Sequence, residues 1–161
     1  MKLKLLLTPR YDADPFGEDD SIDKKLGRTH FLPPLGIATL TAFLKKHNFS
    51  VDQDDLRIKA FYHNLKTKDP KNQIDLQIFN DEKKVEEFIK SGQNSEFEAE
   101  GEKILKLTNC NGFDLFGFSL YETFAPSTAG IALTLGKLLK EKYDAKILIG
   151  GSIHYEVAEK M

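Results

Sequence analysis

The sequence predicts an α/β domain with a doubly wound parallel sheet of the flavodoxin-like (Rossmann-like) type. Two short apolar stretches of strand length, 114–119 and 146–149, flank a segment whose apolar residues recur at helical spacing. Such a βαβ unit places its two strands parallel in one sheet, with a right-handed crossover helix on one face. The remaining segments extend this unit, and the predicted strand order is 2-1-3-4.

The first predicted strand covers residues 2–8 and ends at Pro9, which cannot donate to a sheet ladder. Near-continuous apolar strands are typical of parallel sheets that are covered on both faces. Thr8 is therefore expected at the carboxyl edge, where doubly wound sheets bind ligands. Residues 10–30 follow as a long loop, which is either functional or mobile.

An amphipathic helix is predicted from Pro34 to about His47. Proline suits the first helical position, because its missing N–H would have no partner there, and the basic residues 45–47 complement the negative end of the helix dipole. Gly36 costs up to about 1 kcal/mol relative to alanine inside a helix, so a close neighbour is expected beside it. That neighbour is either another part of the protein or a flat ligand.

The second predicted strand, residues 50–56, is polar and is therefore expected at an edge of the sheet. Asp54 and Asp55 lie at its carboxyl end. Such a pair resembles the phosphorylated corner of a response regulator. Alternatively, the two acids end the strand and help to start the next helix.

A polar insert of about residues 66–112 separates this half of the sheet from the other. One or two helical turns precede it at 58–65, and two helices are predicted within it, at 81–90 and 96–108. Residues 74–78 alternate apolar and polar types, which predicts a short strand or an extended connection. The insert is interpreted as surface without chemistry.

The last strand ends in Gly150 and Gly151, and two glycines after a strand let a ligand approach the backbone. Ligands are expected between this segment and residues 119–123, at the end of the preceding strand. Domains of this type normally have a fifth strand and helix. The chain is therefore expected to be cut short, either as a fragment of a larger protein or as a domain whose last strand comes from elsewhere.

Composition excludes several function classes. A net charge of -2 and a pI near 6.1 give no reason to expect nucleic acid or an anionic membrane as a partner. Cys110 is the single cysteine, so no intramolecular disulfide is expected, and the histidines show no metal-ligand spacing. No apolar stretch reaches membrane-spanning length, and a cytoplasmic location is expected.

Three common catalytic or nucleotide-binding motifs are missing from the sequence. The dinucleotide motif GxGxxG does not follow the first strand, and neither the phosphate-binding motif GxxxxGK[ST] nor the nucleophile motif GxSxG occurs. The sequence therefore disfavours a dinucleotide enzyme, a nucleotide triphosphatase and a serine hydrolase of the elbow type.

Three segments together resemble the cobalamin-binding domain that precedes the catalytic barrel in many radical S-adenosylmethionine (radical SAM) enzymes. LPPLGIATL at 32–40 resembles that domain's opening helix. DLFGFS at 114–119 and ILIGGSIH at 147–154 resemble its later strands, where a serine ends one strand and Gly-Gly ends the next. The resemblance extends over nearly the whole chain except the polar insert.

The resemblance implies a pocket for the corrin ring of cobalamin at the carboxyl ends of the strands, with the nucleotide tail beside the sheet. Three of the implied contacts have other interpretations: Ser119 could satisfy a strand-end backbone group, Tyr121 could be a lid or a packing residue, and His154 could be an exposed loop residue. The residues that match the family's cofactor-binding segments are Thr8, Pro9, Pro34, Leu35, Gly36, Ser119, Tyr121, Thr123, Gly150, Gly151, Ser152 and His154.

The sequence departs from the family in two motifs. Many cobalamin domains carry DxHxxG after the first strand, whose histidine replaces the lower cobalt ligand, and this chain has TPRYDA there. The resemblance therefore implies either cobalamin bound without a protein histidine or a domain that has lost the cofactor. The CxxxCxxC motif is absent too, so S-adenosylmethionine and a 4Fe-4S cluster are expected only in a C-terminal radical SAM domain of the same protein.

No activity is expected for this chain alone. Two other functions remain open from the sequence: a cofactor-free flavodoxin-like scaffold, and a receiver-like signalling domain that uses Asp54 or Asp55.

Overall fold

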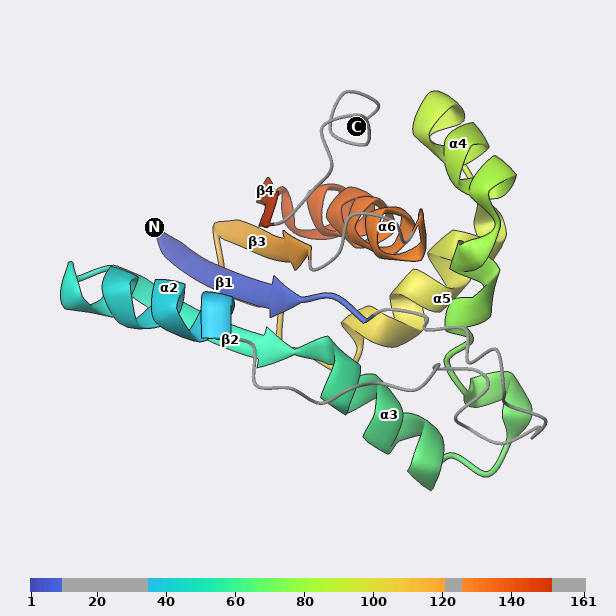
Figure 1. The fold of residues 1–161 in the computed structure, drawn as a ribbon, viewed down its shortest axis with the longest axis horizontal. Helices are drawn as coiled ribbons and strands as arrows, with labels where there is room; N and C mark the ends of the chain where they lie inside the picture. Colours follow the sequence, from blue (N-terminus) through green and yellow to red (C-terminus); the bar gives the residue numbers. More distant parts are fainter. Residues whose placement is uncertain (10–34, 121–125, 152–161) are drawn as a thin grey trace.

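The structure is a computed structural model, and it describes residues 1–9, 35–120 and 126–151. Four parallel strands form one sheet in the order β2-β1-β3-β4, which confirms the predicted doubly wound fold and the edge position of the polar second strand (Figure 1). The strands are β1 (Lys2–Leu7), β2 (Ser50–Asp55), β3 (Leu115–Leu120) and β4 (Lys146–Gly151).

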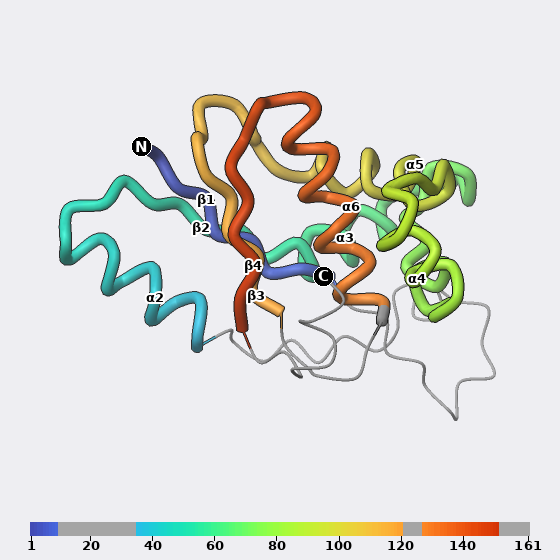
Figure 2. Tube along the Cα trace, turned by 90° about the horizontal axis from the view of Figure 1, so that it is seen from above, coloured from blue at the N-terminus to red at the C-terminus, as the bar shows by residue number. Residues whose placement is uncertain are grey.

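Helices cover the two faces of the sheet unequally. On one face, α2 (Leu35–Lys46) is the single helix among the described residues, and it packs mainly against β1 and β2. On the other face lie α3 (Leu56–Lys66) and α6 (Pro126–Tyr143), and α4 (Glu82–Ser91) and α5 (Ser95–Leu105) pack against α6 (Figures 1 and 2). Because β1 leads to a helix on one face and β3 to a helix on the other, the topological switch point lies between β1 and β3.

The polar insert supplies a large part of the main hydrophobic core, contrary to its interpretation as surface. Phe79 and Phe97 are fully buried, and their ring centroids lie 4.6 Å apart. Both belong to the cluster that also contains Phe116 of β3 and Ile131 of α6. The insert therefore stabilises the α6 side of the sheet.

Residues 74–78 do not form a strand, and residues 76–78 are helical rather than extended. A short 3-10 helix, η2 (Leu76–Asn80), begins there, and Asp75 caps it by accepting a hydrogen bond from the N–H of Gln77. The buried side chain of Asn64 takes the place of a neighbouring strand. Its Nδ2 donates to the carbonyl of Ile74 at 2.8 Å, and the Ile74 N–H donates to Asn64 Oδ1 at 2.7 Å. A second 3-10 helix, η1 (Pro70–Asn72), precedes it.

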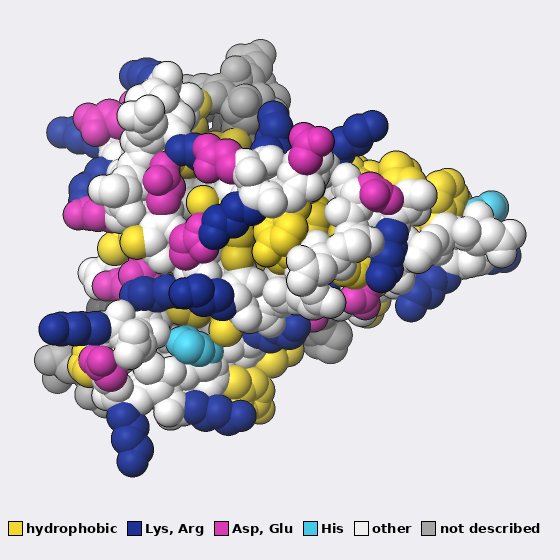
Figure 3. All heavy atoms as spheres, turned by 180° about the vertical axis from the view of Figure 1, so that it is seen from behind, with side chains coloured by type: hydrophobic (Ala, Val, Ile, Leu, Met, Phe, Trp, Pro, Cys, Tyr) yellow, Lys and Arg dark blue, Asp and Glu magenta, His cyan; other side chains and the backbone are white. Residues whose placement is uncertain are grey.

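Charged side chains of both signs intermix over the face of the molecule that Figure 3 shows. That face carries no extended area of a single charge. Among the described residues, no helix has the length and apolar content needed to cross a membrane.

Candidate functional site

The predicted site residues in the described part of the chain meet at the carboxyl edge of the sheet. Ser119 of β3 pairs in register with Leu7 of β1 on one side and with Gly150 of β4 on the other. Thr8 follows β1 directly, and both Thr8 and Pro9 are buried. Pro34, Tyr121, Thr123, Ser152 and His154 lie outside the described residues.

On the sheet face that carries α2, the half formed by β3 and β4 is not covered by any helix in the described part of the chain. Side chains alternate between the two faces of a strand, and Leu3, Leu5 and Leu7 point toward α2. The register places a set of β3 and β4 residues on that same face, beyond the principal contacts of α2. The set is Leu115, Gly117, Ser119, Lys146, Leu148 and Gly150. Leu115 packs against the cluster beneath α2, Gly117 is buried beside Leu5, and Lys146 lies at the opposite end of β4. We call the other three the uncovered half-face: Ser119, Leu148 and Gly150.

The uncovered half-face is apolar and has little side-chain bulk. Leu148 is 58% exposed, which is high for a leucine in the middle of a strand. A Cβ added at Gly150 would meet none of the described atoms within 4 Å. The surface therefore has room for a flat group to approach the backbone.

The two glycines at the end of β4 have different roles. Gly151 has a φ of +124°, and a Cβ there would lie 2.1 Å from the carbonyl oxygen of Leu120. Gly151 is therefore required by the backbone itself, whereas Gly150 leaves open space. The sequence alone did not distinguish them.

Leu35 and Gly36 open α2 at the same edge. Leu35 is exposed, and a Cβ added at Gly36 would meet nothing within 4 Å among the described residues. The expected close protein neighbour of Gly36 is thus not found in the described part of the chain. The expectation of a flat ligand beside Gly36 stays a prediction.

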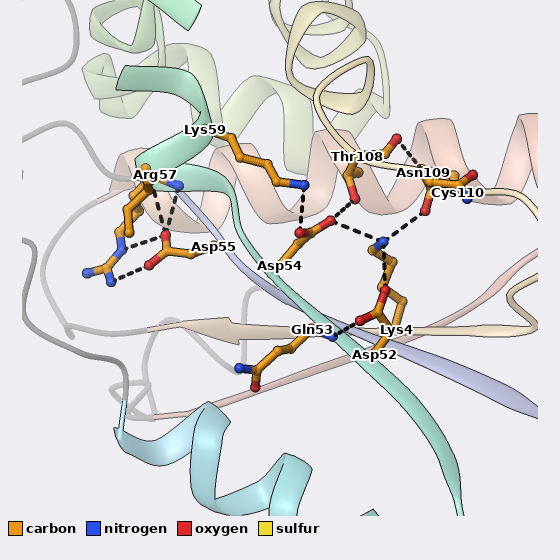
Figure 4. Close-up of polar contacts among 11 residues, drawn as sticks. Lys4, Asp52, Gln53, Asp54, Asp55, Arg57, Lys59, Thr108, Asn109 and Cys110 are labelled. Carbon is orange, nitrogen blue, oxygen red and sulfur yellow. Dashed lines mark hydrogen bonds and ion pairs between the residues drawn. The ribbon is translucent and has the colours of Figure 1, made fainter. Parts of the chain in front are cut away.

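Asp54 and Asp55 are engaged in contacts that stabilise the fold (Figure 4). Asp55 caps α3 by accepting hydrogen bonds from the backbone N–H groups of Arg57 and Ile58, and it forms an ion pair with the Arg57 side chain at 2.8 Å. Asp54 contacts Lys59 at 2.6 Å and Lys4 at 3.1 Å. These contacts support the interpretation that the acids end the strand and start the next helix.

The environment of Asp54 favours its charged form. Burial raises the pKa of this carboxyl, but hydrogen bonds from Lys59, Thr108 and Lys4 outweigh burial, so the pKa lies below its ordinary value. Within the described ranges, no group of three or more His, Cys, Asp or Glu side chains could bind a metal ion. The acidic cluster that a receiver site uses is therefore not found in the described part of the chain.

Cys110 and the two described histidines do not contribute to the carboxyl edge. Cys110 is buried, and burial raises the pKa of its thiol. His63 Nε2 lies 3.0 Å from the carbonyl oxygen of Asn72, and the His47 ring packs on the Phe43 ring near the end of α2. No described imidazole is therefore placed to bind a ligand at this edge.

Ser127 and Thr128, in the first turn of α6, were not singled out from the sequence. Their hydroxyls are buried, and like that of Thr8 they have no hydrogen-bond partner among the described residues. The tripeptide Pro-Ser-Thr after a strand could have drawn attention to them, because proline marks the first helical position and hydroxyl residues are common there.

Searches of protein-family models, of curated proteins and of solved structures find no match to this chain.

Proposed function

We propose that this chain is the cobalamin-binding module of a radical SAM enzyme. It would hold the corrinoid for a methyl transfer or another radical reaction, which a C-terminal radical SAM domain of the same protein carries out. S-adenosylmethionine and the iron–sulfur cluster would belong to that other domain. The proposal starts from the resemblance of segments 32–40, 114–119 and 147–154 to the cobalamin-binding family.

The uncovered half-face is the observation that carries the proposal. A corrin ring is broad and flat, so it needs a surface where small residues let it approach the backbone. Ser119 and Gly150 are small, and the exposed side chain of Leu148 gives an apolar contact. Ser119 and Gly150 lie at the edge where doubly wound sheets bind ligands.

Each residue at this edge would have a defined task. Gly150 would give the ring access to the backbone, and Ser119, next to it in register, would donate or accept a hydrogen bond at the rim. Leu35 at the start of α2 would contribute apolar surface. Bound cobalamin would supply a cobalt centre for group transfer, while the protein orients it and excludes water.

The sequence lacks the DxHxxG motif after β1, so the proposal has cobalamin bound without a protein imidazole as the lower ligand. A shift in the visible spectrum that marks imidazole ligation is therefore not expected when hydroxocobalamin binds.

The test is retention of hydroxocobalamin by the purified chain on a desalting column, followed by its visible spectrum. We expect about one cobalamin per chain, and we expect Gly150→Leu to abolish retention because the side chain fills the open space beside Ser119. Ala99→Leu also adds a leucine, at an exposed position of α5, and should retain cobalamin like the wild type.

Two results would contradict the proposal. If Gly150→Leu retains cobalamin as well as the wild type does, the uncovered half-face is not the binding surface. If the wild-type chain retains none at high micromolar cobalamin, a cofactor-free scaffold is favoured instead.

A further inference from the structure

Three buried hydroxyl groups at the carboxyl edge have no hydrogen-bond partner among the described residues: those of Thr8, Ser127 and Thr128. The exposed fractions of these residues are 3%, 0% and 3%. Buried polar groups in folded proteins almost always have a partner, because an unpaired one loses its hydrogen bonds to water without compensation. Three unpaired hydroxyls in one region therefore indicate a missing ligand.

The start of α6 is also a source of unpaired backbone donors. The first N–H groups of a helix have no acceptor within the helix, and Pro126 has no N–H, which leaves those of Ser127 and Thr128 without an acceptor in the helix. The preceding residue, Ala125, has no side-chain acceptor, unlike the usual capping residues. No acidic residue in the first turn offsets the positive end of the dipole of this 18-residue helix.

The hydroxyl of Thr8 lies on the same side of the sheet as α6. Leu6 belongs to the core cluster shared with α6, whereas Leu5 and Leu7 belong to the cluster beneath α2. Side chains alternate along a strand, so Thr8 points to the α6 side, as Leu6 does. The end of β1 and the start of α6 lie at the same edge of the molecule (Figures 1 and 2).

The hydroxyls of Ser127 and Thr128 point toward that edge as well. In an α-helix each Cα–Cβ bond is tilted toward the helix N-terminus, so side chains in the first turn lean in the direction of the free N–H groups. The hydroxyls of Ser127 and Thr128 and the free N–H groups therefore lie at the same end of α6, at the edge of the sheet where β1 ends (Figures 1 and 2). Each of these groups can donate a hydrogen bond.

We propose that the first turn of α6 and Thr8 form a binding site for a phosphate group. Phosphate has several acceptor oxygens and a negative charge, which suit a cluster of neutral donors at the positive end of a helix. The site lies on the α6 side of the sheet, opposite the uncovered half-face. It is thus separate from the proposed cobalamin surface, so an experiment that contradicts one proposal leaves the other untouched.

The experiment is a titration of the ¹⁵N-labelled chain with inorganic phosphate at constant ionic strength, followed by NMR. Saturable shifts are expected for the amides of Ser127 and Thr128. Thr8→Val and Thr128→Val keep the side-chain shape but remove a donor, and each should weaken phosphate binding by about tenfold or more.

Thr134→Val is the matched control. Thr134 is buried in the same helix, but its hydroxyl already donates to the carbonyl of Gly130 at 2.7 Å. This variant should bind phosphate with unchanged affinity. Without phosphate, Thr8→Val and Thr128→Val should unfold at the same temperature as the wild type or higher, because they remove unpaired buried hydroxyls, whereas Thr134→Val should unfold at a lower temperature.

Methyl phosphate distinguishes the two sources of the phosphate group. Binding of methyl phosphate as tight as that of inorganic phosphate indicates a phosphate ester of a larger ligand, and much weaker binding indicates the free ion. The proposal is overturned if the amides at the start of α6 show no saturable shift at tens of millimolar phosphate. It is equally overturned if Thr8→Val and Thr128→Val bind phosphate as the wild type does.

Discussion

The ammonium of Lys4 and the carboxylate of Asp54 form an ion pair on the α3 side of the sheet, with Nζ 3.1 Å from Oδ2. The Lys4 side chain is only 3% exposed, and its Nζ also donates to the carbonyl of Asn109 at 3.0 Å. A buried lysine needs such partners, because an uncompensated buried charge is strongly destabilising. Together, the contacts of Lys4 with Asp54 and with Asn109 link β1 to β2 and to the segment after α5 (Figure 4).

Asp54→Asn is expected to lower the free energy of unfolding by roughly 2–3 kcal/mol at neutral pH. This is less than the roughly 3–5 kcal/mol typical of breaking a buried pair, because Asp52 and the Asn109 carbonyl still contact Lys4. Asp52→Asn is the control. Its carboxylate is exposed and 3.4 Å from Lys4, so the cost should stay below about 1 kcal/mol.

The cost of Asp54→Asn should also depend on pH. The pKa of Asp54 is lower in the folded chain than its ordinary value of 3.8, so its charge stabilises the fold above that value. This contribution is lost as pH falls through the folded-state pKa. Urea unfolding of the wild type and Asp54→Asn should therefore converge in acid, and a difference that grows on acidification would contradict the assignment.

Gly150 and Gly151 should differ in the stability that they lose on replacement by alanine. Gly151→Ala is expected to cost at least about 2 kcal/mol, because its Cβ would collide with the Leu120 carbonyl and its φ of +124° disfavours any side chain. Gly150→Ala should change stability by less than about 0.5 kcal/mol, since the position is open. Thermal unfolding of the two variants compares them directly, and equal losses would refute the difference in role.

Gly101 should be the least replaceable helical glycine. An added Cβ would lie 2.8 Å from Thr134 Cγ2 and 2.9 Å from Leu138 Cδ1, so Gly101→Ala would force α5 away from α6 and cost roughly 1–3 kcal/mol. Gly36→Ala in α2 meets no described atom and should be neutral or stabilising by up to about 1 kcal/mol. Chemical denaturation of both variants tests the contrast, and a stabilising Gly101→Ala would show that the helices are not closely packed there.

Asn64→Ala should destabilise the insert. Both polar atoms of the buried side chain bond to the backbone of Ile74, and their loss leaves that backbone unpaired. A cost of roughly 2–4 kcal/mol is expected from two buried hydrogen bonds. Hydrogen exchange of the Ile74 amide should become faster in the variant, and unchanged protection would mean that other groups hold this segment.

The sheet order was predictable because three of its strands are apolar stretches of strand length and the polar one had to lie at an edge. The 3-10 helix at Leu76 was not predicted, because the alternation of apolar and polar residues at 74–78 indicated a strand. In the structure, the side chain of Asn64 forms the backbone hydrogen bonds of Ile74 that a neighbouring strand would otherwise form. The core role of Phe79 and Phe97 was hidden by the charged residues around them.

The candidate site could be predicted only in outline. The register of Ser119 with Gly150 follows from the fold class, but the contrast between Gly150 and Gly151 depends on a backbone angle that the residue type does not specify. The unpaired hydroxyls of Ser127 and Thr128 depend on tertiary burial, which a Pro-Ser-Thr sequence does not reveal.

Hydrogen exchange with and without hydroxocobalamin tests most directly whether the uncovered half-face binds the cofactor. Binding there should slow exchange in β3 and β4, which form that surface, and leave β2 at the far edge of the sheet unchanged. Protection of β2 and α3 with none in β4, or no protection at saturating cobalamin, would contradict the proposed binding surface.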